Sequence, residues 1–434
     1  MAYDLILRNG RLKGGSRSDV AVRNGRIADV GTDLAGSAER EVDASDLWIL
    51  PGLVDTHVHF NDPGRETWEG IRTGSRASAA GGVTTFADMP LNSSPPVISV
   101  DSFHRKKDSL SESSRVHFAV WGGWVPGNEA EISLLADAGV IGFKAFLCDS
   151  GLDEFPPVPI AGLQEGMARI ADTGRRLALH AEHPDRLRPP GHNAEGWSAS
   201  RPIEAELDAI RAVLDAASST GCPVQIVHVT SRRCARLVHT AREQGLDAIC
   251  ETCPHYLALT QNDTTRLGPV AKCAPPLRSE QERAGLWTAL QQKEIQTIGS
   301  DHSPCPPGMK DAEFSSAWGG ISGVQNGLSL LHTLHPEFLS RLVEAMSETP
   351  ASLFHLPGKG RIEVGADADI VLFDDADEFR IRENDLLYRH RQSPYIGMHC
   401  RGRVLETILK GRTIFDGNRV MDDERGTWVR PESP

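Results

Sequence analysis

Residues 47–60 read LWILPGLVDTHVHF, an apolar run that ends in two histidines one residue apart. The run suits a buried strand, and because side chains alternate along a strand, His57 and His59 project to the same side. One histidine in an apolar strand is commonly a hydrogen-bonded core residue, whereas two on one face at a strand end suggest a metal site. The segments that follow decide between these two interpretations.

Seven further apolar segments follow this one, and helical patterns separate most of them. These segments are GGVTTFADMPL (81–91), VHFAVWGGW (116–124), GVIGFKAFL (139–147), RLALHAEH (176–183), PVQIVHVTS (223–231), DAICETCPHYL (247–257) and IQTIGSDHSP (295–304). Between two of them, residues 204–221 have the pattern of an amphipathic helix with a terminal glycine. Eight strands alternating with helices predict an α/β fold, a (β/α)8 barrel of the TIM type over residues 51–360.

The two ends of the chain have a different texture. The sequence RNGR occurs at 8–11 and again at 23–26, each time between alternating apolar segments, which is typical of a hairpin. Near the C-terminus, residues 365–374 and 402–411 repeat this style. We therefore expect one small β-sandwich domain assembled from both termini, residues 1–50 plus 361–434.

Composition narrows the possible partners and the location. The formal net charge of −13 over 434 residues argues against nucleic acid or an anionic membrane as a partner. We find neither a signal peptide nor an apolar run of the ~20 residues that span a bilayer, so we expect a cytoplasmic protein without a membrane partner. Eight scattered cysteines fit reduced thiols. We interpret the C-x-x-C pair, Cys250 and Cys253, as two thiols at a strand end rather than a redox or metal site.

Polar side chains stand where several of these strands end. Lys144 lies in the fourth strand, His180 in the fifth, His228 in the sixth and Asp301 in the eighth. In a TIM barrel, this end of the strands carries the catalytic residues. Imidazole and carboxylate suit divalent first-row metals, of which zinc is a common choice. Lys144 needs an explanation, since a lone buried ammonium is costly; a salt bridge to Asp301 or an outward-pointing side chain are its ordinary alternatives.

Five of these motifs together resemble the cyclic-amidohydrolase branch of the amidohydrolase superfamily, which includes dihydroorotases, hydantoinases (dihydropyrimidinases) and allantoinases. They are PGLVDTHVHF, GFKAF, LALHAEH, IVHVTS and GSDHSPCPP. The resemblance implies that CO2 carboxylates Lys144 to N6-carboxylysine, whose carbamate bridges two divalent metal ions. Zinc is the first choice, and cobalt, manganese and iron accept the same ligands.

The resemblance also implies a role for each ligand. His57, His59 and Asp301 bind the more buried ion, and His180 and His228 bind the second. A hydroxide held between two such ions attacks a carbonyl. As the catalytic residue, Asp301 orients this hydroxide, accepts its proton and passes it to the leaving nitrogen. The expected reaction is the hydrolytic opening of a cyclic amide or ureide, a small-molecule substrate.

Local sequence separates the branches of this group. Dihydroorotases continue after the histidine pair with Leu-Arg-Glu-Pro-Gly, whereas this chain has Asn61 in place of the arginine. Hydantoinases carry a tyrosine soon after the lysine, and residues 144–158 contain none. The segments at 62–70, 88–96 and 300–325 resemble allantoinases, which implies that the protein opens the hydantoin ring of allantoin to allantoate in purine degradation. A hydantoinase or a dihydroorotase stays as the alternative.

Substrate contacts are expected in the loops. Asn92 could bond a ring carbonyl or hold its own turn, and Arg65 could meet the ureido group or a neighbouring carboxylate. Relatives present backbone groups to the ring at positions that match Cys273, Ala274 and Ser322.

Other expectations concern the surroundings of the site and the assembly. His255 and His302 are candidates for outer positions of the site, with an ordinary structural histidine favoured for His255. Residues 303–323, rich in glycine and proline, could form a mobile loop bordering the site. The family resemblance implies a homo-oligomer, a tetramer. A catalytically inactive relative would have lost metal ligands, whereas all six are present here.

Overall fold

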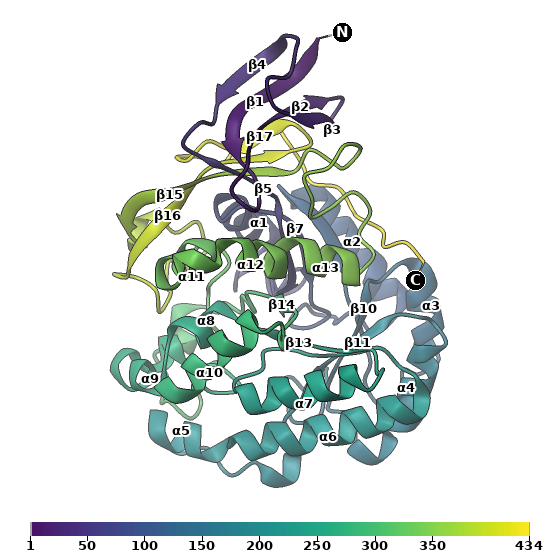
Figure 1. Ribbon diagram of the computed structural model, residues 1–434. Helices are drawn as coiled ribbons and strands as arrows, with labels where there is room; N and C mark the ends of the chain where they lie inside the picture. Colours follow the sequence, from purple (N-terminus) through teal and green to yellow (C-terminus); the bar gives the residue numbers. More distant parts are fainter. Residues whose placement is uncertain (1, 434) are drawn as a thin grey trace.

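A computed structural model describes residues 2–433 of the chain, and its centre is a barrel of parallel strands (Figure 1). The barrel strands are β6 (Leu53–Val58), β7 (Val83–Asp88), β8 (His117–Val120), β10 (Gly142–Phe146), β11 (Arg176–His180), β12 (Val224–Ile226), β13 (Ala248–Thr252) and β14 (Thr297–Ile298). A two-residue strand, β9 (Gly122–Gly123), pairs with β10. Each of the eight predicted segments contains one barrel strand, so the predicted TIM-type barrel is confirmed.

Backbone hydrogen bonds close the barrel at two joints. The strands form runs in the orders β6-β7-β8 and β14-β13-β12-β11-β10-β9. The N–H of His59 donates to the carbonyl of His302 over 2.8 Å, which joins the first strand to the segment after the last. The N–H of Ile141 donates to the carbonyl of Val120 over 3.0 Å and joins the runs on the other side. All C-terminal strand ends therefore face one end of the barrel.

Helices surround the barrel (Figure 1). They are α1 (Ile71–Ala80), α2 (Val100–Ser113), α3 (Glu131–Ala138), α4 (Leu163–Ala171), α5 (Ala194–Ser200), α6 (Ile203–Thr220), α7 (Arg232–Glu243), α8 (Pro254–Ala258), α9 (Gln261–Leu267), α10 (Glu280–Gln291), α11 (Gly327–Leu334), α12 (Leu339–Val343) and α13 (Thr349–Leu353). Local sequence sets their ends. Ser99 forms a capping box at the start of α2, and Gly221 ends α6 in the left-handed conformation.

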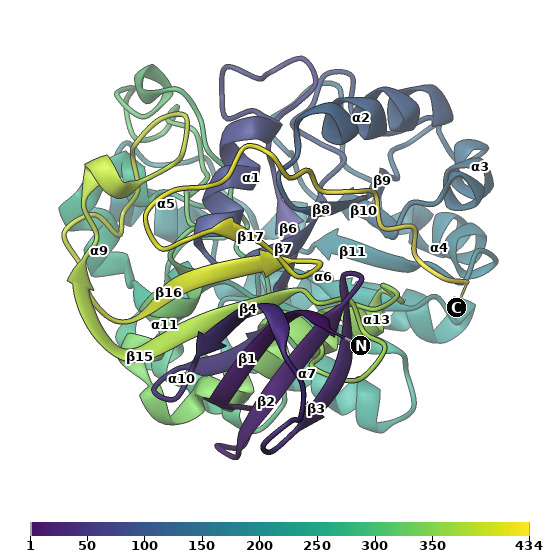
Figure 2. The same ribbon diagram turned by 90° about the horizontal axis from the view of Figure 1, so that it is seen from above.

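A second sheet combines strands from both ends of the chain (Figure 2). Its strands are β1 (Tyr3–Arg11), β2 (Arg17–Arg23), β3 (Arg26–Gly31), β4 (Ala38–Asp43), β5 (Trp48–Pro51), β15 (Ile370–Arg380), β16 (His399–Leu409) and β17 (Arg412–Phe415). Their order is β17-β16-β15-β5-β1-β2-β3, and β4 pairs with β1. The C-terminal segment continues beyond this sheet to the barrel. There, Thr427 and Val429 exchange backbone hydrogen bonds with Phe118 of barrel strand β8.

The stretch 47–60 serves both sheets, although its sequence reads as one continuous strand. Its first part, β5, pairs with β15 in the terminal sheet, where Ile49 lies opposite Leu372. Gly52 separates it from β6 of the barrel. A Cβ atom at Gly52 would lie 2.1 Å from the hydroxyl oxygen of Thr84, so only glycine fits at this crossing.

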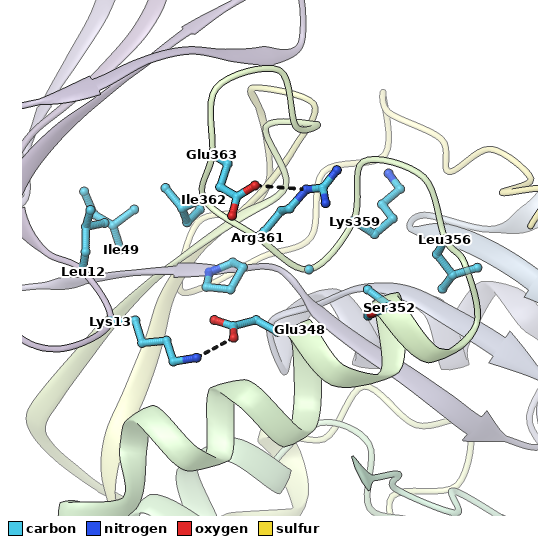
Figure 3. A pocket seen from close by; sticks show the side chains of 13 residues that line it. Leu12, Lys13, Ile49, Glu348, Ser352, Leu356, Lys359, Arg361, Ile362 and Glu363 are labelled. Carbon is cyan, nitrogen blue, oxygen red and sulfur yellow. Dashed lines mark hydrogen bonds and ion pairs between the residues drawn. The ribbon is translucent and has the colours of Figure 1, made fainter. Parts of the chain in front are cut away.

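The two parts also enclose a cavity of about 400 Å³ between the terminal sheet and α13 (Figure 3). Ile49 of the sheet and Leu12 and Lys13 of the turn after β1 line one side of it, and the barrel side contributes Glu348 and Ser352. An ion pair between Lys13 and Glu348 crosses from one part to the other. The composite sheet is thus bound to the barrel by ionic as well as backbone contacts.

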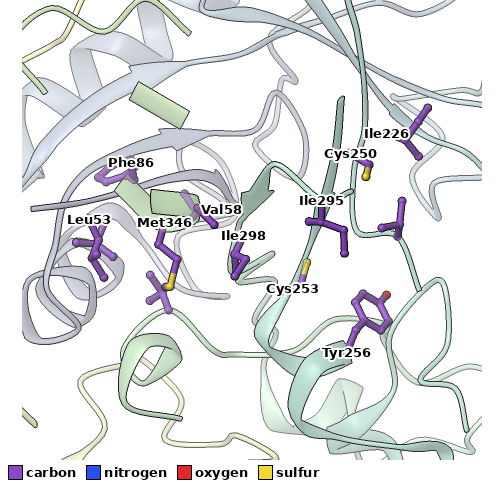
Figure 4. Close-up of a cluster of buried hydrophobic side chains, with 14 of the residues drawn as sticks. Leu53, Val58, Phe86, Ile226, Cys250, Cys253, Tyr256, Ile295, Ile298 and Met346 are labelled. Atoms are coloured by element: carbon purple, nitrogen blue, oxygen red, sulfur yellow. The ribbon is translucent and has the colours of Figure 1, made fainter. Parts of the chain in front are cut away.

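The barrel core is apolar and includes the C-x-x-C pair. Figure 4 shows Val58, Phe86 and Ile298 in this cluster, with Cys250 and Cys253 among them. All eight cysteines are buried free thiols. Among the residues that the structure describes, no helix combines the length and hydrophobicity needed to cross a membrane.

Candidate active site

The six residues predicted as metal ligands come together at the C-terminal end of the barrel. All six line one cavity of about 430 Å³: His57, His59, Lys144, His180, His228 and Asp301. One carboxylate oxygen of Asp301 lies 3.3 Å from Nε2 of His57 and 3.4 Å from Nε2 of His59. The rings of His180 and His228 have centroids 4.6 Å apart. Five barrel strands or strand ends, far apart in sequence, therefore supply one compact donor set.

Two of these residues have strained backbones. His228 has a φ of 43° and Asp301 a φ of 44°, in the left-handed region that side chains other than glycine rarely adopt. Such conformations cost of order 1–3 kcal/mol and persist where the surroundings fix them, commonly at functional sites. The strain thus marks the same two positions that the sequence motifs indicate.

Fixed partners orient the histidines of the first strand. Nδ1 of His57 lies 2.6 Å from Glu251, and Nδ1 of His59 lies 3.0 Å from the carbonyl oxygen of Leu91. In each ring, a proton on Nδ1 satisfies this contact and leaves the lone pair on Nε2. Both Nε2 atoms face Asp301, as expected of two ligands to one metal ion.

A second carboxylate orients the histidine of the fifth strand. Nε2 of His180 lies 2.7 Å from Glu182, and the ring of His180 stacks on Phe146 with a centroid distance of 4.7 Å. Glu182 is fully buried and also pairs with Arg201 over 2.6 Å. Burial alone would raise the pKa of Glu182, but Arg201 and His180 lower it to about 2, so the carboxylate is ionised.

Lys144 lies in an apolar strand, where a buried lysine needs a physical explanation. Its residue is only 1% exposed, which excludes an outward-pointing side chain. Within residues 2–433, its Nζ atom has no hydrogen-bond partner. Burial lowers the pKa of Lys144 to about 8, although the charges of Asp301 and Glu251 oppose this shift. An unpartnered amine in the middle of a donor set is the chemical feature that a lysine carbamate would resolve.

The protonation states suit metal binding. Burial lowers the pKa values of His59, His180 and His228, so these imidazoles are neutral and keep a lone pair for a ligand bond. Burial raises the pKa of Asp301, but the neighbouring His57 and His59 outweigh this effect and hold it below its ordinary value. His57, His59 and Asp301 form one group whose donor atoms could hold a metal ion.

Of the two side chains expected at the substrate, only Asn92 lines the cavity. Its side-chain amide donates to the side-chain oxygen of Asn61 over 3.1 Å. Arg65 is not among the residues that line this cavity. Its guanidinium donates to the carbonyl oxygen of Asn92 and pairs with Glu154 over 2.6 Å. Of the two partners considered for Arg65, the neighbouring carboxylate is therefore the one that it contacts.

The three positions expected to offer backbone groups differ from one another. Ala274 lines the cavity. The carbonyl of Cys273 accepts a hydrogen bond from Trp197, and the carbonyl of Ser322 accepts one from the hydroxyl of Ser393. Those two carbonyls are thus engaged within the protein.

The two outer histidines also differ. Nδ1 of His302 accepts from the N–H of Gly323, and its Nε2 lies 3.7 Å from Glu69. Neither ring nitrogen of His255 has a hydrogen-bond partner in the described part of the chain. Burial lowers the pKa of His255 to about 4, so the ring is neutral.

Several residues of the site were not predicted from the sequence. Glu251 lies in an apolar strand two residues before Cys253, and Glu182 lies two residues after His180; each carboxylate faces a histidine. Their position inside apolar strand ends was an available signal, because an isolated acidic residue is rarely buried without a partner. Lys272, which also lines the cavity, had no such signal.

The family model described as the amidohydrolase family matches residues 48–414. The chain belongs to the amidohydrolase family. It is 46% identical to an allantoinase of Rubrobacter xylanophilus over 99% of this chain and 98% of the relative. It is 43% identical to an allantoinase of Solibacter usitatus over 99% of this chain and 97% of the relative.

A solved structure resembles this amidohydrolase along its whole length. The L-hydantoinase (dihydropyrimidinase) from Arthrobacter aurescens matches with a TM-score of 0.95 and 32% identity, covering 99% of this chain and 100% of that one. The sequence relatives are thus named for one cyclic ureide and the structural relative for another.

Proposed function

We propose that this amidohydrolase is an allantoinase, which hydrolyses the hydantoin ring of allantoin to give allantoate. The observation that carries the proposal is the convergence of four neutral or partnered imidazoles, one carboxylate and one unpartnered lysine on a single cavity. Full-length similarity to allantoinases, at 46% and 43% identity, supports the choice of substrate.

The donor set fits two divalent metal ions. His57, His59 and Asp301 would hold one ion, and His180 and His228 the other, with Lys144 between them as N6-carboxylysine. The unpartnered, buried Nζ of Lys144 supports this assignment, because carboxylation by CO2 replaces a costly cation with an anionic ligand. Zinc is the first candidate for the metal, and cobalt, manganese and iron suit the same donors. When bound, the ions supply Lewis acidity and lower the pKa of water.

Residues of the chain perform the remaining steps. Asp301 sits beside the histidine pair and is ionised, so it can accept the proton of the attacking water. The same carboxyl group then delivers this proton to the ring nitrogen as the amide bond breaks. Asn92 would orient the ring; its position in the cavity lining and its hydrogen bond to Asn61 support this role.

Assembly and location are further parts of the proposal. We expect a homo-oligomer, a tetramer by family resemblance, and sedimentation velocity measures it directly. The eight free, buried cysteines support a reducing compartment such as the cytoplasm.

A substrate panel tests the proposed function against its main alternative. The likeness to an L-hydantoinase, at 32% identity, makes hydantoin hydrolysis the second candidate. Protein loaded with zinc in bicarbonate buffer is given allantoin, hydantoin, dihydrouracil or dihydroorotate at equal concentration. We expect the largest kcat/KM for allantoin; a larger value for any other ring would reject the proposal.

A further inference from the structure

One wall of the active-site cavity is a loop with little regular structure. Residues 315–319, which include Trp318, line the cavity together with the metal-ligand candidates. Such a loop cannot satisfy its carbonyl groups in a helix or a sheet, yet buried carbonyls need hydrogen-bond donors. The residues that supply these donors therefore determine the shape of the wall.

Lys272 supplies three of them. Its Nζ atom donates to the carbonyl oxygens of Phe314, Ser315 and Ala317, at 2.7, 3.0 and 2.7 Å. An ammonium group has three hydrogens, so this one has no donor left for a substrate. The residue is 2% exposed, and Nζ lies 4.1 Å from the ring centroid of Trp197.

Lys310, which lies shortly before this wall segment in the sequence, makes a similar set of bonds. Its Nζ atom donates to the carbonyl oxygens of Pro269, Trp318 and Gly320, at 2.9, 2.8 and 2.7 Å. Pro269 belongs to the short 3-10 helix Gly268–Ala271, which immediately precedes Lys272. One lysine thus reaches from this segment into the loop, and the other donates to carbonyls of both.

Neither lysine forms a salt bridge with a carboxylate, as judged over residues 2–433. Burying an ammonium group without an anion is costly unless hydrogen bonds replace its water. Carbonyl dipoles, together with the faces of Trp197 and Phe314, surround the charge of Lys272. Two buried ammonium groups beside the active site thus donate their hydrogen bonds to backbone carbonyls of the loop. This arrangement suggests that the geometry of the loop matters to the site.

We propose that Lys272 and Lys310 are positioning residues, which clamp residues 314–320 into a fixed wall of the substrate cavity. The identity of the substrate in this inference rests on the proposed function, but the clamp itself does not. Because the clamped segment contains none of the metal-ligand candidates, its loss weakens substrate binding more than the chemical step. Lys272→Met and Lys310→Met therefore raise KM while leaving kcat and metal content close to those of the parent protein.

The test combines hydrogen exchange with kinetics on the metal-loaded, full-length protein. We expect the amides of residues 314–320 to exchange at least about tenfold faster in either methionine variant, with exchange in β6 and β11 unchanged. KM for allantoin rises about tenfold or more, and kcat stays within about threefold. Lys272→Gln keeps one amide donor group and gives an intermediate loop exchange rate.

Lys359→Met is the matched control, since Lys359 is also buried but pairs with Asp367 and Asp369 and does not line the active-site cavity. It leaves loop exchange unchanged. Loop exchange at the parent rate in folded Lys272→Met and Lys310→Met would overturn the clamp. If the parent protein does not hydrolyse allantoin, the proposed function fails, and loop exchange still decides the clamp independently.

Discussion

The ring nitrogen Nδ1 of His57, at the end of strand β6, lies 2.6 Å from a carboxylate oxygen of Glu251 in strand β13. Both side chains are buried, and the other oxygen of Glu251 accepts a hydrogen bond from Gln225. This contact fixes the ring so that Nε2 faces Asp301. The carboxylate thus determines which histidine nitrogen is offered as a ligand.

Replacing Glu251 by glutamine should weaken metal binding. The amide keeps the shape of the side chain but lacks the charge that favours a proton on Nδ1 of His57. We expect the dissociation constant of the more buried ion to rise by about 10–100-fold. Competition with a chelator, followed by metal analysis, measures this change. Glu294→Gln is the control, because Glu294 is also buried but pairs with Arg232; an effect equal to that of Glu251→Gln would reject the orienting role.

Replacing Lys144 by alanine should remove the ligand proposed to join the two metal sites. We expect the variant to bind less metal per subunit than the parent and to lose activity by about a hundredfold or more, since a metal site contributes several kcal/mol to catalysis. Labelled bicarbonate should give a carbamate carbon signal in the NMR spectrum of the parent only. Full metal content and full activity in Lys144→Ala would show that the assignment is wrong.

The ion pair between the partly buried Arg201 and the fully buried Glu182 should contribute strongly to stability. Arg201→Met leaves Glu182 as an unpaired buried charge, and we expect the free energy of unfolding to fall by about 3–5 kcal/mol. Adding Glu182→Gln removes that charge and should restore part of the loss. Urea unfolding of the parent, of Arg201→Met, of Glu182→Gln and of the double variant measures this coupling; additive losses would contradict it.

His117 should make the protein less stable in mild acid. Its Nδ1 accepts a hydrogen bond from the N–H of Thr427, and its Nε2 lies 3.8 Å from Asp369. Burial lowers the pKa of His117 to about 4, an effect that Lys359 and Lys410 reinforce and the carboxylates of Asp369 and Asp367 oppose.

The direction of this pH effect follows from linkage. Because the unfolded chain, with a pKa of about 6.5, binds the proton more readily, stability falls as the pH drops below 6.5 and continues to fall until about pH 4. The total loss is about 3 kcal/mol. Urea unfolding of the parent and of His117→Gln between pH 7 and 4.5 isolates the contribution of His117 to the free energy of unfolding. The same pH dependence of this free energy in both proteins would contradict the prediction.

Much of the fold and the donor set could be predicted because each barrel strand carries its own signal. Eight apolar segments each contain a barrel strand, and the polar residues at their ends converge because parallel strands share one C-terminal edge. The steric demand for glycine at position 52 could not be predicted, because Thr84 comes from another strand and only the fold brings its hydroxyl oxygen to 2.1 Å from a Cβ atom at Gly52.

The surroundings of the site were harder to predict than its centre. Arg65 follows the histidine pair in sequence, but its partner Glu154 comes from another loop, and only the fold brings them together. Lys272 and Lys310 bond carbonyl groups, which leave no trace in the identity of the residues that carry them. Contacts to backbone atoms between distant loops therefore could not be predicted from the sequence.

The most direct test of the proposed function is the hydrolysis of racemic allantoin by protein purified with zinc and bicarbonate, followed through the formation of allantoate. We expect turnover on the order of 1–1,000 per second, as in other metabolic enzymes. Protein that binds metal but forms no allantoate would contradict it.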